Sequence, residues 1–248
     1  MKNLQTAYFP TVEAIKTAAE KLNGIAAVTP LEEHTRFSQE YECKMLFKRE
    51  DLQQVRSYKI RGAYNKISSL SNENIKDGII CASAGNHAQG VALSCRLLKI
   101  KGKIFMPAPT PNQKVEQVKM FGQEYVEVVL VGDTFDDSYH MAIKESEHFG
   151  KPLVHPFNDP KVIEGQGTVG LEIIQQAKSP IDYIFIPVGG GGLASGLSSI
   201  VKASSPNTKI IGVEPAGAPS MSKSINRGEV VQLDEIEKFV DGASVQRV

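Results

Sequence analysis

The 248-residue sequence has no tryptophan, only three cysteines and no net charge. Cys43, Cys81 and Cys95 are odd in number and form no C-x-x-C pair, so they predict buried free thiols rather than a disulfide framework or a zinc site. The 28 Lys and Arg residues balance 28 Asp and Glu residues, which removes any bulk attraction toward nucleic acid or an anionic membrane. We therefore expect a small-molecule partner.

Long hydrophobic runs are also missing. No apolar stretch reaches the length of a membrane span, and the first six residues, MKNLQT, lack the apolar stretch of a secretory signal. We expect a cytoplasmic protein without a membrane partner. A hydrophobic content of 41% over 248 residues is nevertheless enough to bury a core, in one large domain or two small ones.

What is present is a repeated unit: an apolar run, a turn, and a helix with 3.6-residue periodicity. Continuously apolar strands that alternate with helices indicate α/β architecture with parallel sheets covered on both faces, in three layers. Breaks near residues 71–77 and 150–152 predict a small domain, residues 73–150, inserted into a larger one, residues 1–72 plus 151–248. The predicted strands are residues 44–48, 78–82, 103–106, 125–131, 153–155, 181–187 and 209–214.

A glycine-rich loop, residues 187–196 (PVGGGGLASG), runs from a predicted strand directly into an amphipathic helix. Free backbone N–H groups at a helix N-terminus form a cradle for phosphate. A flexible linker has a similar composition, but a linker does not join a buried strand to an amphipathic helix. The first strand lacks a following G-x-G-x-x-G, and no Walker lysine is present, which disfavours a dinucleotide or a nucleoside triphosphate.

A second polar turn, residues 83–90 (SAGNHAQG), occupies the equivalent place after the strand that ends at Ala82. The Ser83 hydroxyl and the amides of the next helix could hold a carboxylate, and Asn86 could contact a ring or a hydroxyl. An ordinary helix cap explains the same residues equally well. We interpret His87 as a hydrogen-bonding residue and the other four histidines as unclustered structural residues: His34, His140, His148 and His155.

Lys59 stands where a short strand gives way to a helical pattern, within residues 56–63 (RSYKIRGA). A lone lysine is usually a solvated surface cation. Together with the two candidate anion sites, however, Lys59 is a candidate to carry an aldehyde cofactor as a Schiff base. The alternating glycines of residues 162–170 are explained by close packing alone, and the acidic residues 133–137 by a helix entrance.

With these motifs assembled, the chain resembles the threonine dehydratase (threonine ammonia-lyase) family of pyridoxal 5'-phosphate (PLP) enzymes, of the tryptophan-synthase-β fold type, fold type II. The resemblance rests on residues 57–63, 83–90, 164–168 (EGQGT) and 189–193 in the family's order and spacing. It implies that Lys59 binds the cofactor aldehyde and acts as the catalytic base. It further implies a phosphate site at Gly189, Gly190, Gly191, Gly192 and Leu193, a cofactor contact at Asn86, and a substrate-carboxylate site at Ser83, Ala84, Gly85 and His87.

The implied reaction is deamination of L-threonine to 2-oxobutanoate and ammonia, as the first step of isoleucine biosynthesis, in a homo-oligomer. The sequence of residues 49–57 (REDLQQVRS) is more similar to the biosynthetic members of the family than to the others. Two alternatives remain: serine dehydration or racemisation on the same scaffold, and a cofactor-binding fragment without full activity. Related serine racemases have a second serine where Ala84 stands, and a methyl group cannot transfer a proton, so elimination is favoured.

Two departures from the family concern a metal and the end of the chain. Ser220 stands where the relatives that bind a divalent cation have an acidic ligand, so we expect no metal even though Glu214 and the Ala218 carbonyl match. In the family the catalytic domain continues beyond residues 240–244 (VDGAS) and supplies a partner for the pyridine nitrogen. We expect that partner, the last part of the large domain and the regulatory domain of many biosynthetic members to be absent from these 248 residues.

Overall fold

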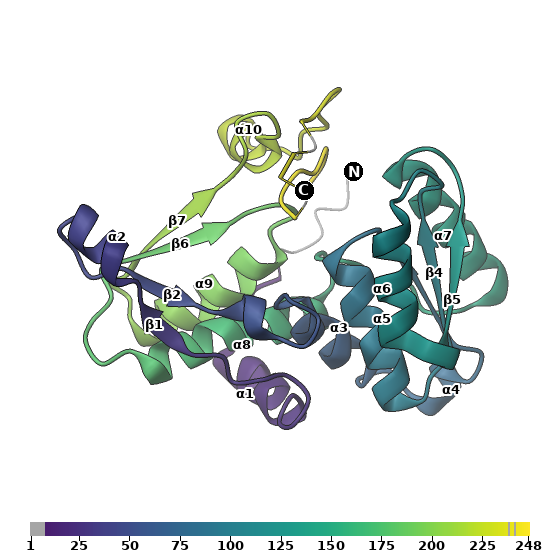
Figure 1. The fold of residues 1–248 in the computed structure, drawn as a ribbon, viewed down its shortest axis with the longest axis horizontal. Helices are drawn as coiled ribbons and strands as arrows, with labels where there is room; N and C mark the ends of the chain where they lie inside the picture. The colour runs from purple at the N-terminus through teal and green to yellow at the C-terminus, as the bar shows by residue number, and fades with distance from the viewer. Residues whose placement is uncertain (1–7, 238, 241) are drawn as a thin grey trace.

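A computed structural model describes residues 8–237, 239–240 and 242–248 of the chain, which fold into two parts lying side by side (Figure 1). Each part contains a parallel sheet that packs against helices, which confirms the α/β class. The two parts meet along helix α3 (Lys59–Ile67), which packs against α5 (Asn86–Leu98) on one side and α8 (Pro160–Gln176) on the other.

The first part is a three-layer unit around a sheet of β3 (Ile79–Ala82), β4 (Gly102–Met106) and β5 (Val126–Leu130), in that order. Alternate residues of β3 point to opposite faces, as strand geometry requires. Ile79 and Cys81 join the cluster formed with α5 and α6 (Asn112–Gly122), whereas Ile80 and Ala82 pack with Ala142 of α7 (Phe135–Phe149). Both faces are therefore covered, as the apolar runs predict.

The second part contains a parallel pair, β6 (Tyr183–Pro187) and β7 (Lys209–Val213). One face of this pair packs against α1 (Val12–Lys21), α8 and α9 (Gly192–Ser204), and α10 (Ser220–Arg227) follows β7. Beside it, β1 (Leu31–Glu33) pairs antiparallel with β2 (Leu46–Lys48), with α2 (Thr35–Glu40) between them in the chain and the 3₁₀ turn η1 (Glu50–Leu52) following. This ribbon departs from the expected all-parallel sheets, because the short connection through α2 returns the chain in the opposite direction.

Local signals at helix ends agree with the structure. The Thr11 side chain accepts a hydrogen bond from Ala14 N at 3.1 Å and caps α1, and Gly24 has φ +74° after its end. Thr134 and Asp137 form a capping box at the acidic entrance of α7, which confirms the reading of that segment. The polar connection after residue 71 contains a one-turn helix, α4 (Asn72–Ile75), and η2 (Gln123–Tyr125) precedes β5.

The expectation of three buried thiols was wrong for Cys43, which is exposed, whereas Cys81 and Cys95 are buried. Cys43 lies in the turn after α2, where no second layer covers the chain. The predicted strand at residues 153–155 is reduced to a single parallel bridge between Leu153 and Ile80, supported by a bond from Val154 N to Ile80 O at 2.8 Å.

The division into two domains stays a proposal. The two sheets are separate, but the Leu153 bridge and the packing of Ile60, Ala63 and Ile67 from α3 into the core of the first part cross the proposed boundaries.

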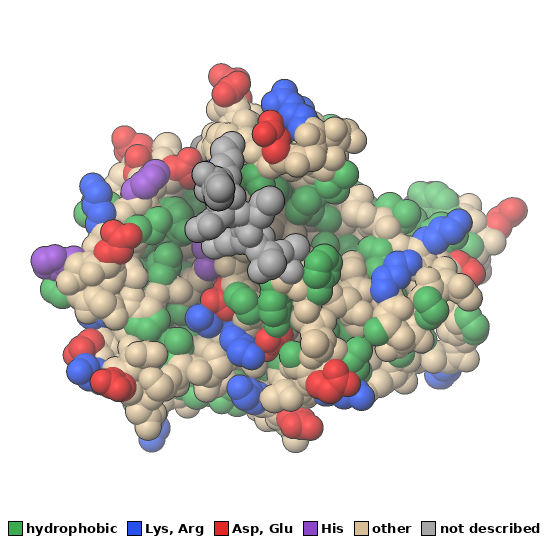
Figure 2. All heavy atoms as spheres, turned by 180° about the vertical axis from the view of Figure 1, so that it is seen from behind, with side chains coloured by type: hydrophobic (Ala, Val, Ile, Leu, Met, Phe, Trp, Pro, Cys, Tyr) green, Lys and Arg blue, Asp and Glu red, His purple; other side chains and the backbone are tan. Residues whose placement is uncertain are grey.

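Acidic and basic side chains are interspersed on the face shown in Figure 2, as expected from the balanced composition. Among the helices of the described residues, none combines the length and the apolar character that crossing a membrane requires.

Candidate functional site

Lys59 is the first residue of α3, and its side chain is partly buried between the two parts of the molecule. Its Nζ atom donates a hydrogen bond to the carbonyl oxygen of Pro156 at 3.1 Å, and no carboxylate of the described residues forms an ion pair with it. Burial lowers the pKa of Lys59 to about 8 because the charged form is poorly solvated. A sizeable share of neutral amine is therefore available near neutral pH, as a nucleophile or base requires.

Glycines hold the backbone of α3 in place. A Cβ atom at Gly90 of α5 would lie 3.0 Å from the carbonyl carbon of Lys59, and one at Gly165 of α8 would lie 2.5 Å from Arg61 O. A Cβ at Gly62 would lie 2.4 Å from Nε2 of Gln166. The three helices thus approach to a distance that excludes side chains, which confirms packing as the reason for the glycine at residue 165.

The glycine-rich loop forms a tight cradle at the N-terminus of α9. Gly191 has φ +85°, and a Cβ at Gly190 would lie 2.3 Å from the Phe157 ring. The first helical bond runs from Ser195 N to Gly191 O at 2.8 Å. Within the described residues, no hydrogen bond is made by the backbone N–H groups of residues 189–194. These groups are free to bind an anion, and the helix dipole favours one there.

The polar turn before α5 has the same character. Gly85 is the N-cap of α5 and provides no side-chain cap, while its N–H donates to Ser83 Oγ at 3.3 Å. Asn86, the first helical residue, is exposed, and Ala84 packs against the core of the first part. The site therefore has a second helix N-terminus whose first N–H groups are uncapped by a side chain.

His87 is buried, and its Nε2 lies 3.0 Å from the carbonyl oxygen of Val154. Burial, followed by the nearby charge of Lys59, lowers the pKa of His87 to about 3, so its ring is neutral and donates from Nε2. The expectation of a hydrogen-bonding histidine is confirmed. Its role toward a substrate carboxylate stays a prediction.

One segment, residues 154–158, links these motifs, and the sequence reasoning missed it. Val154 O is the hydrogen-bond partner of His87, Pro156 O accepts a hydrogen bond from Lys59, and the Phe157 ring packs against Gly190. His155 Nδ1 accepts from the backbone N–H groups of residues 157 and 158, at 3.2 and 2.8 Å, and fixes the turn. The available signal was position, because the segment follows a strand residue paired with β3, at the edge of the sheet where ligands bind.

Residues 242 and 243 close the remaining side. A Cβ at Gly189 would lie 3.3 Å from Gly242 O, and one at Gly242 would lie 4.0 Å from Asn86 Nδ2. The structure thus brings together the Lys59 segment, the Asn86 turn and the glycine loop, through residues 154–158 on one side and 242–243 on the other.

The arrangement fits PLP. An amine with a lowered pKa suits the aldehyde, and the backbone N–H groups of the glycine loop, which make no hydrogen bond within the described residues, suit the phosphate. The carboxylate of Glu214, which the sequence offered as a metal ligand, accepts hydrogen bonds from Met221 N and Ser222 N at 2.7 and 2.8 Å, at the start of α10.

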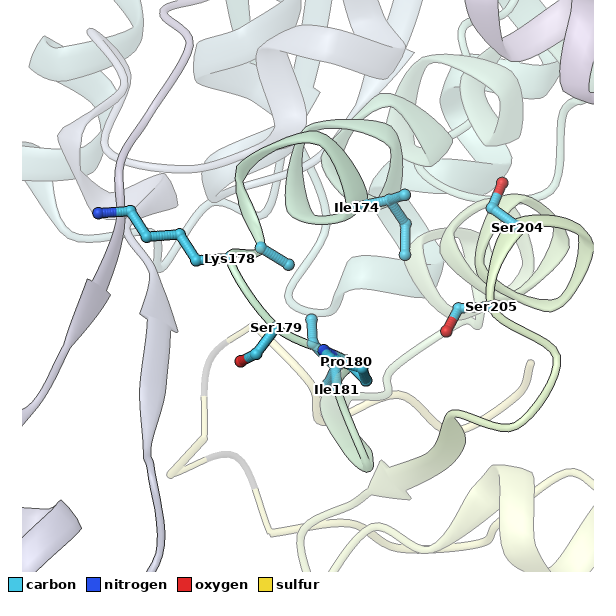
Figure 3. A pocket seen from close by; sticks show the side chains of 8 residues that line it. Ile174, Lys178, Ser179, Pro180, Ile181, Ser204 and Ser205 are labelled. Carbon is cyan, nitrogen blue, oxygen red and sulfur yellow. The ribbon is translucent and has the colours of Figure 1, made fainter.

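A surface hollow lies at the C-terminal ends of α8 and α9, away from the glycine loop (Figure 3). Figure 3 shows the Lys178 side chain directed away from the other lining residues. Because the glycine loop is at the N-terminus of α9 and the hollow is at its C-terminus, the hollow does not belong to the site. Its lining residues are Ile174, Ala177, Lys178, Ser179, Pro180, Ile181, Ser204 and Ser205.

Residues 22–248 match the family described as "Pyridoxal-phosphate dependent enzyme", and the chain belongs to this family of fold type II enzymes, which depend on PLP. Among its relatives is "L-threonine dehydratase biosynthetic IlvA" of Halalkalibacterium halodurans, 53% identical over 237 residues, which cover 96% of this chain and 57% of the relative. The Bacillus subtilis protein of the same name is 50% identical over 96% of this chain and 56% of its own length. The chain therefore spans just over half the length of these curated relatives.

Solved structures agree with this assignment. The processed form of threonine deaminase isoform 2 from Solanum lycopersicum superposes with a TM-score of 0.90 and 45% identity, over 95% of this chain and 64% of that one. Maize serine racemase has the same TM-score with 33% identity, over 96% of this chain and 71% of that one.

Proposed function

We propose that this chain carries the cofactor site of an L-threonine dehydratase, which converts L-threonine to 2-oxobutanoate and ammonia in the cytoplasm and feeds isoleucine synthesis. The observation that carries the proposal is the Lys59 amine, which has a lowered pKa and contacts Pro156 O, one residue before the Phe157 ring that packs against the glycine loop. The names of the curated relatives support threonine as the substrate.

When bound, PLP would supply an aldehyde, to which the Lys59 amine would be joined, and a ring that would take up the electrons released at the substrate's Cα. The neutral Lys59 amine, once released, takes the proton from that Cα. The backbone N–H groups of residues 189–193 would hold the phosphate, and those at the start of α5 would hold the substrate carboxylate. Holding the substrate by its carboxylate fixes the direction of the Cα–H bond toward Lys59.

Serine dehydration or racemisation is the second candidate, favoured by the likeness to maize serine racemase. Ala84 argues against racemisation, because its methyl group cannot deliver a proton to the face opposite Lys59. Turnover of L-threonine, L-serine and D-serine by the same preparation separates these activities. Formation of D-serine from L-serine at a rate above that of 2-oxo acid formation would favour the racemase.

The primary test is formation of 2-oxo acid from L-threonine by the chain loaded with PLP. We expect product from the parent protein and none from Lys59→Ala. A parent protein that binds PLP at Lys59 but forms no product from any of the three substrates is the cofactor-binding fragment without full activity, and the dehydratase proposal then fails.

We also propose a homo-oligomer, either a dimer or a tetramer. Light scattering coupled to size exclusion measures the mass directly. A monomeric mass at working concentration contradicts this part of the proposal.

A further inference from the structure

We propose that Arg61 is a positioning residue for Lys59: its guanidinium, clamped between Glu50 and Glu172, sets the place of the Lys59 amine relative to the glycine loop. This inference rests on the proposed function, in which Lys59 binds the cofactor. The Arg61 ion pairs would thus hold α3 in place together with the glycine packing described above.

The Arg61 side chain is only 1% exposed, and every N–H direction of its guanidinium is used. Nε and Nη2 bind the two carboxylate oxygens of Glu50 at 2.8 and 2.7 Å, and Nη1 and Nη2 bind those of Glu172 at 2.6 and 3.0 Å. Thr168 Oγ1 and Ala27 O accept two further bonds at 3.2 and 3.1 Å. This is a fork that meets one carboxylate on each side.

The clamp is balanced in charge. Lys48 Nζ bonds to Glu172 and donates to Gln176 Oε1 at 3.1 Å, so two cations meet two carboxylates. Thr29 Oγ1 also donates a hydrogen bond to Glu50, so protein groups replace water as the partners of the Glu50 carboxylate. Only a planar guanidinium can bridge two carboxylates in this way, because a lysine ammonium presents a point charge without the fork.

The clamp acts at the right place. Arg61 is two residues after Lys59 in the first turn of α3, and its partners lie on η1 and α8. Helix α8 begins at Pro160, directly after the segment in which Pro156 O binds Lys59 and Phe157 supports Gly190. Arg61 therefore connects α3, which carries Lys59, to α8, which follows the residues that contact Lys59 and Gly190.

A purely structural role is the competing explanation, because removing one member of a buried ion cluster destabilises most proteins. Such a role changes the unfolding temperature but leaves the chemistry of Lys59 unchanged in the folded protein. The positioning role changes how fast, and at which pH, Lys59 reacts with PLP while the protein is folded.

The test compares Arg61→Lys with the parent chain and with Arg49→Lys. Arg49 makes the same kind of contact, at 2.9 Å to Glu32 and Asp51, but on the surface. PLP attachment to Lys59 is trapped with borohydride and located by peptide mass spectrometry, at several pH values and at a temperature where circular dichroism shows folded protein. We expect Arg61→Lys to lower the attachment rate by roughly ten- to a hundredfold and to move the pH of half-maximal rate, whereas Arg49→Lys changes neither.

A folded Arg61→Lys protein with the parental rate and pH profile overturns the inference, as does an equal loss in Arg49→Lys. If Arg61→Lys does not fold, Glu172→Gln, which keeps the size of the partner and removes its charge, decides by the same criteria. Failure of both variants to fold establishes a purely structural role instead. Attachment of PLP to other lysines of the parent chain, with none at Lys59, would contradict the proposed function itself, which separates the two failures.

Discussion

At the scale of single residues, the cost of burying the Lys59 charge gives a test that needs no cofactor. Its one hydrogen-bond acceptor within the described residues is a neutral carbonyl, Pro156 O, which compensates an ammonium poorly. We expect Lys59→Met to raise the free energy of unfolding of the cofactor-free protein at pH 7 by roughly 1 to 3 kcal/mol. Denaturant titration measures the change.

The pH dependence of that gain has a defined sign. The pKa of Lys59 is about 8 in the folded protein and 10.5 ordinarily, so between these values the unfolded chain binds more protons. The stability of the parent therefore rises across this window, and the advantage of Lys59→Met shrinks. Lys66→Met, in the same helix, removes an ion pair to Asp159 at 2.7 Å and serves as the control, which gives no gain. An advantage that does not vary with pH would contradict burial as the cause.

Histidine 155 gives a second prediction, in acid. Burial lowers its pKa to about 4 from an ordinary 6.5, so the unfolded chain takes up the proton first and stability falls as pH drops between these values. We expect His155→Asn to weaken this loss, because Asn Oδ1 can still accept from the backbone N–H groups of Phe157 and Asn158. Denaturant titrations from pH 7 to 4 measure it.

His140→Asn, at an exposed position on α7, is the matched control. Equal pH slopes for the parent and His155→Asn would show that the acid sensitivity arises elsewhere. His87, whose pKa is lowered to about 3 mainly by burial, contributes to the slope in both proteins.

The site residues divide by how they act. Lys59, Asn86 and the glycine loop could be predicted because their side chains, or the lack of them, form a pattern along the chain. Pro156 and Phe157 could not be predicted. Pro156 acts through its carbonyl oxygen, and Phe157 through the packing of its ring against Gly190. Neither contribution changes the local sequence pattern, and both depend on contacts between segments far apart in the chain.

At the scale of elements, the strands and helices of the α/β units could be predicted from apolar runs and periodicity. Strands β3 and β4, for example, are continuously apolar because both of their faces are buried. Strand β2 was predicted, as residues 44–48, but its antiparallel pairing with β1 was not, because Glu32 and Glu33 lack any apolar alternation and the pairing is set by the chain reversal at α2. Cap residues were predictable because capping is a local interaction.

The packing of α8 on α9 yields the third prediction. A Cβ at Gly196 would lie 2.3 Å from Ile163 O and 2.7 Å from Gly167 N, and backbone atoms cannot move aside as a flexible side chain can. We expect Gly196→Ala to destabilise the protein by roughly 1 to 3 kcal/mol despite the better helix propensity of alanine. Thermal and denaturant unfolding measure the loss.

Ser195→Ala is the adjacent control, since Ser195 is exposed on the same helix. It is expected to change stability by no more than about 0.5 kcal/mol. A Gly196→Ala protein as stable as Ser195→Ala would show that the two helices can separate without cost.

At the scale of the whole molecule, the described residues cover the β6–β7 pair on one face only. Ile184, Ile186 and Ile210 pack into the core with α8 and α9, whereas Tyr183 and Phe185 on the other face are 51% and 64% exposed. Parallel sheets are rarely left open in this way. An apolar strip on a sheet of only two strands favours association with other apolar surfaces.

We therefore predict concentration-dependent self-association through this face, weakened by Phe185→Thr. Threonine keeps the strand propensity while removing the more exposed of the two rings on this face, so the fold is retained and the apolar area falls. Sedimentation velocity over a concentration series measures the shift toward smaller species. Met120→Gln removes a 58% exposed apolar side chain from α6, in the other part of the molecule, and leaves the association unchanged. Equal effects of the two substitutions would show that general surface hydrophobicity, and not the open sheet face, drives the association.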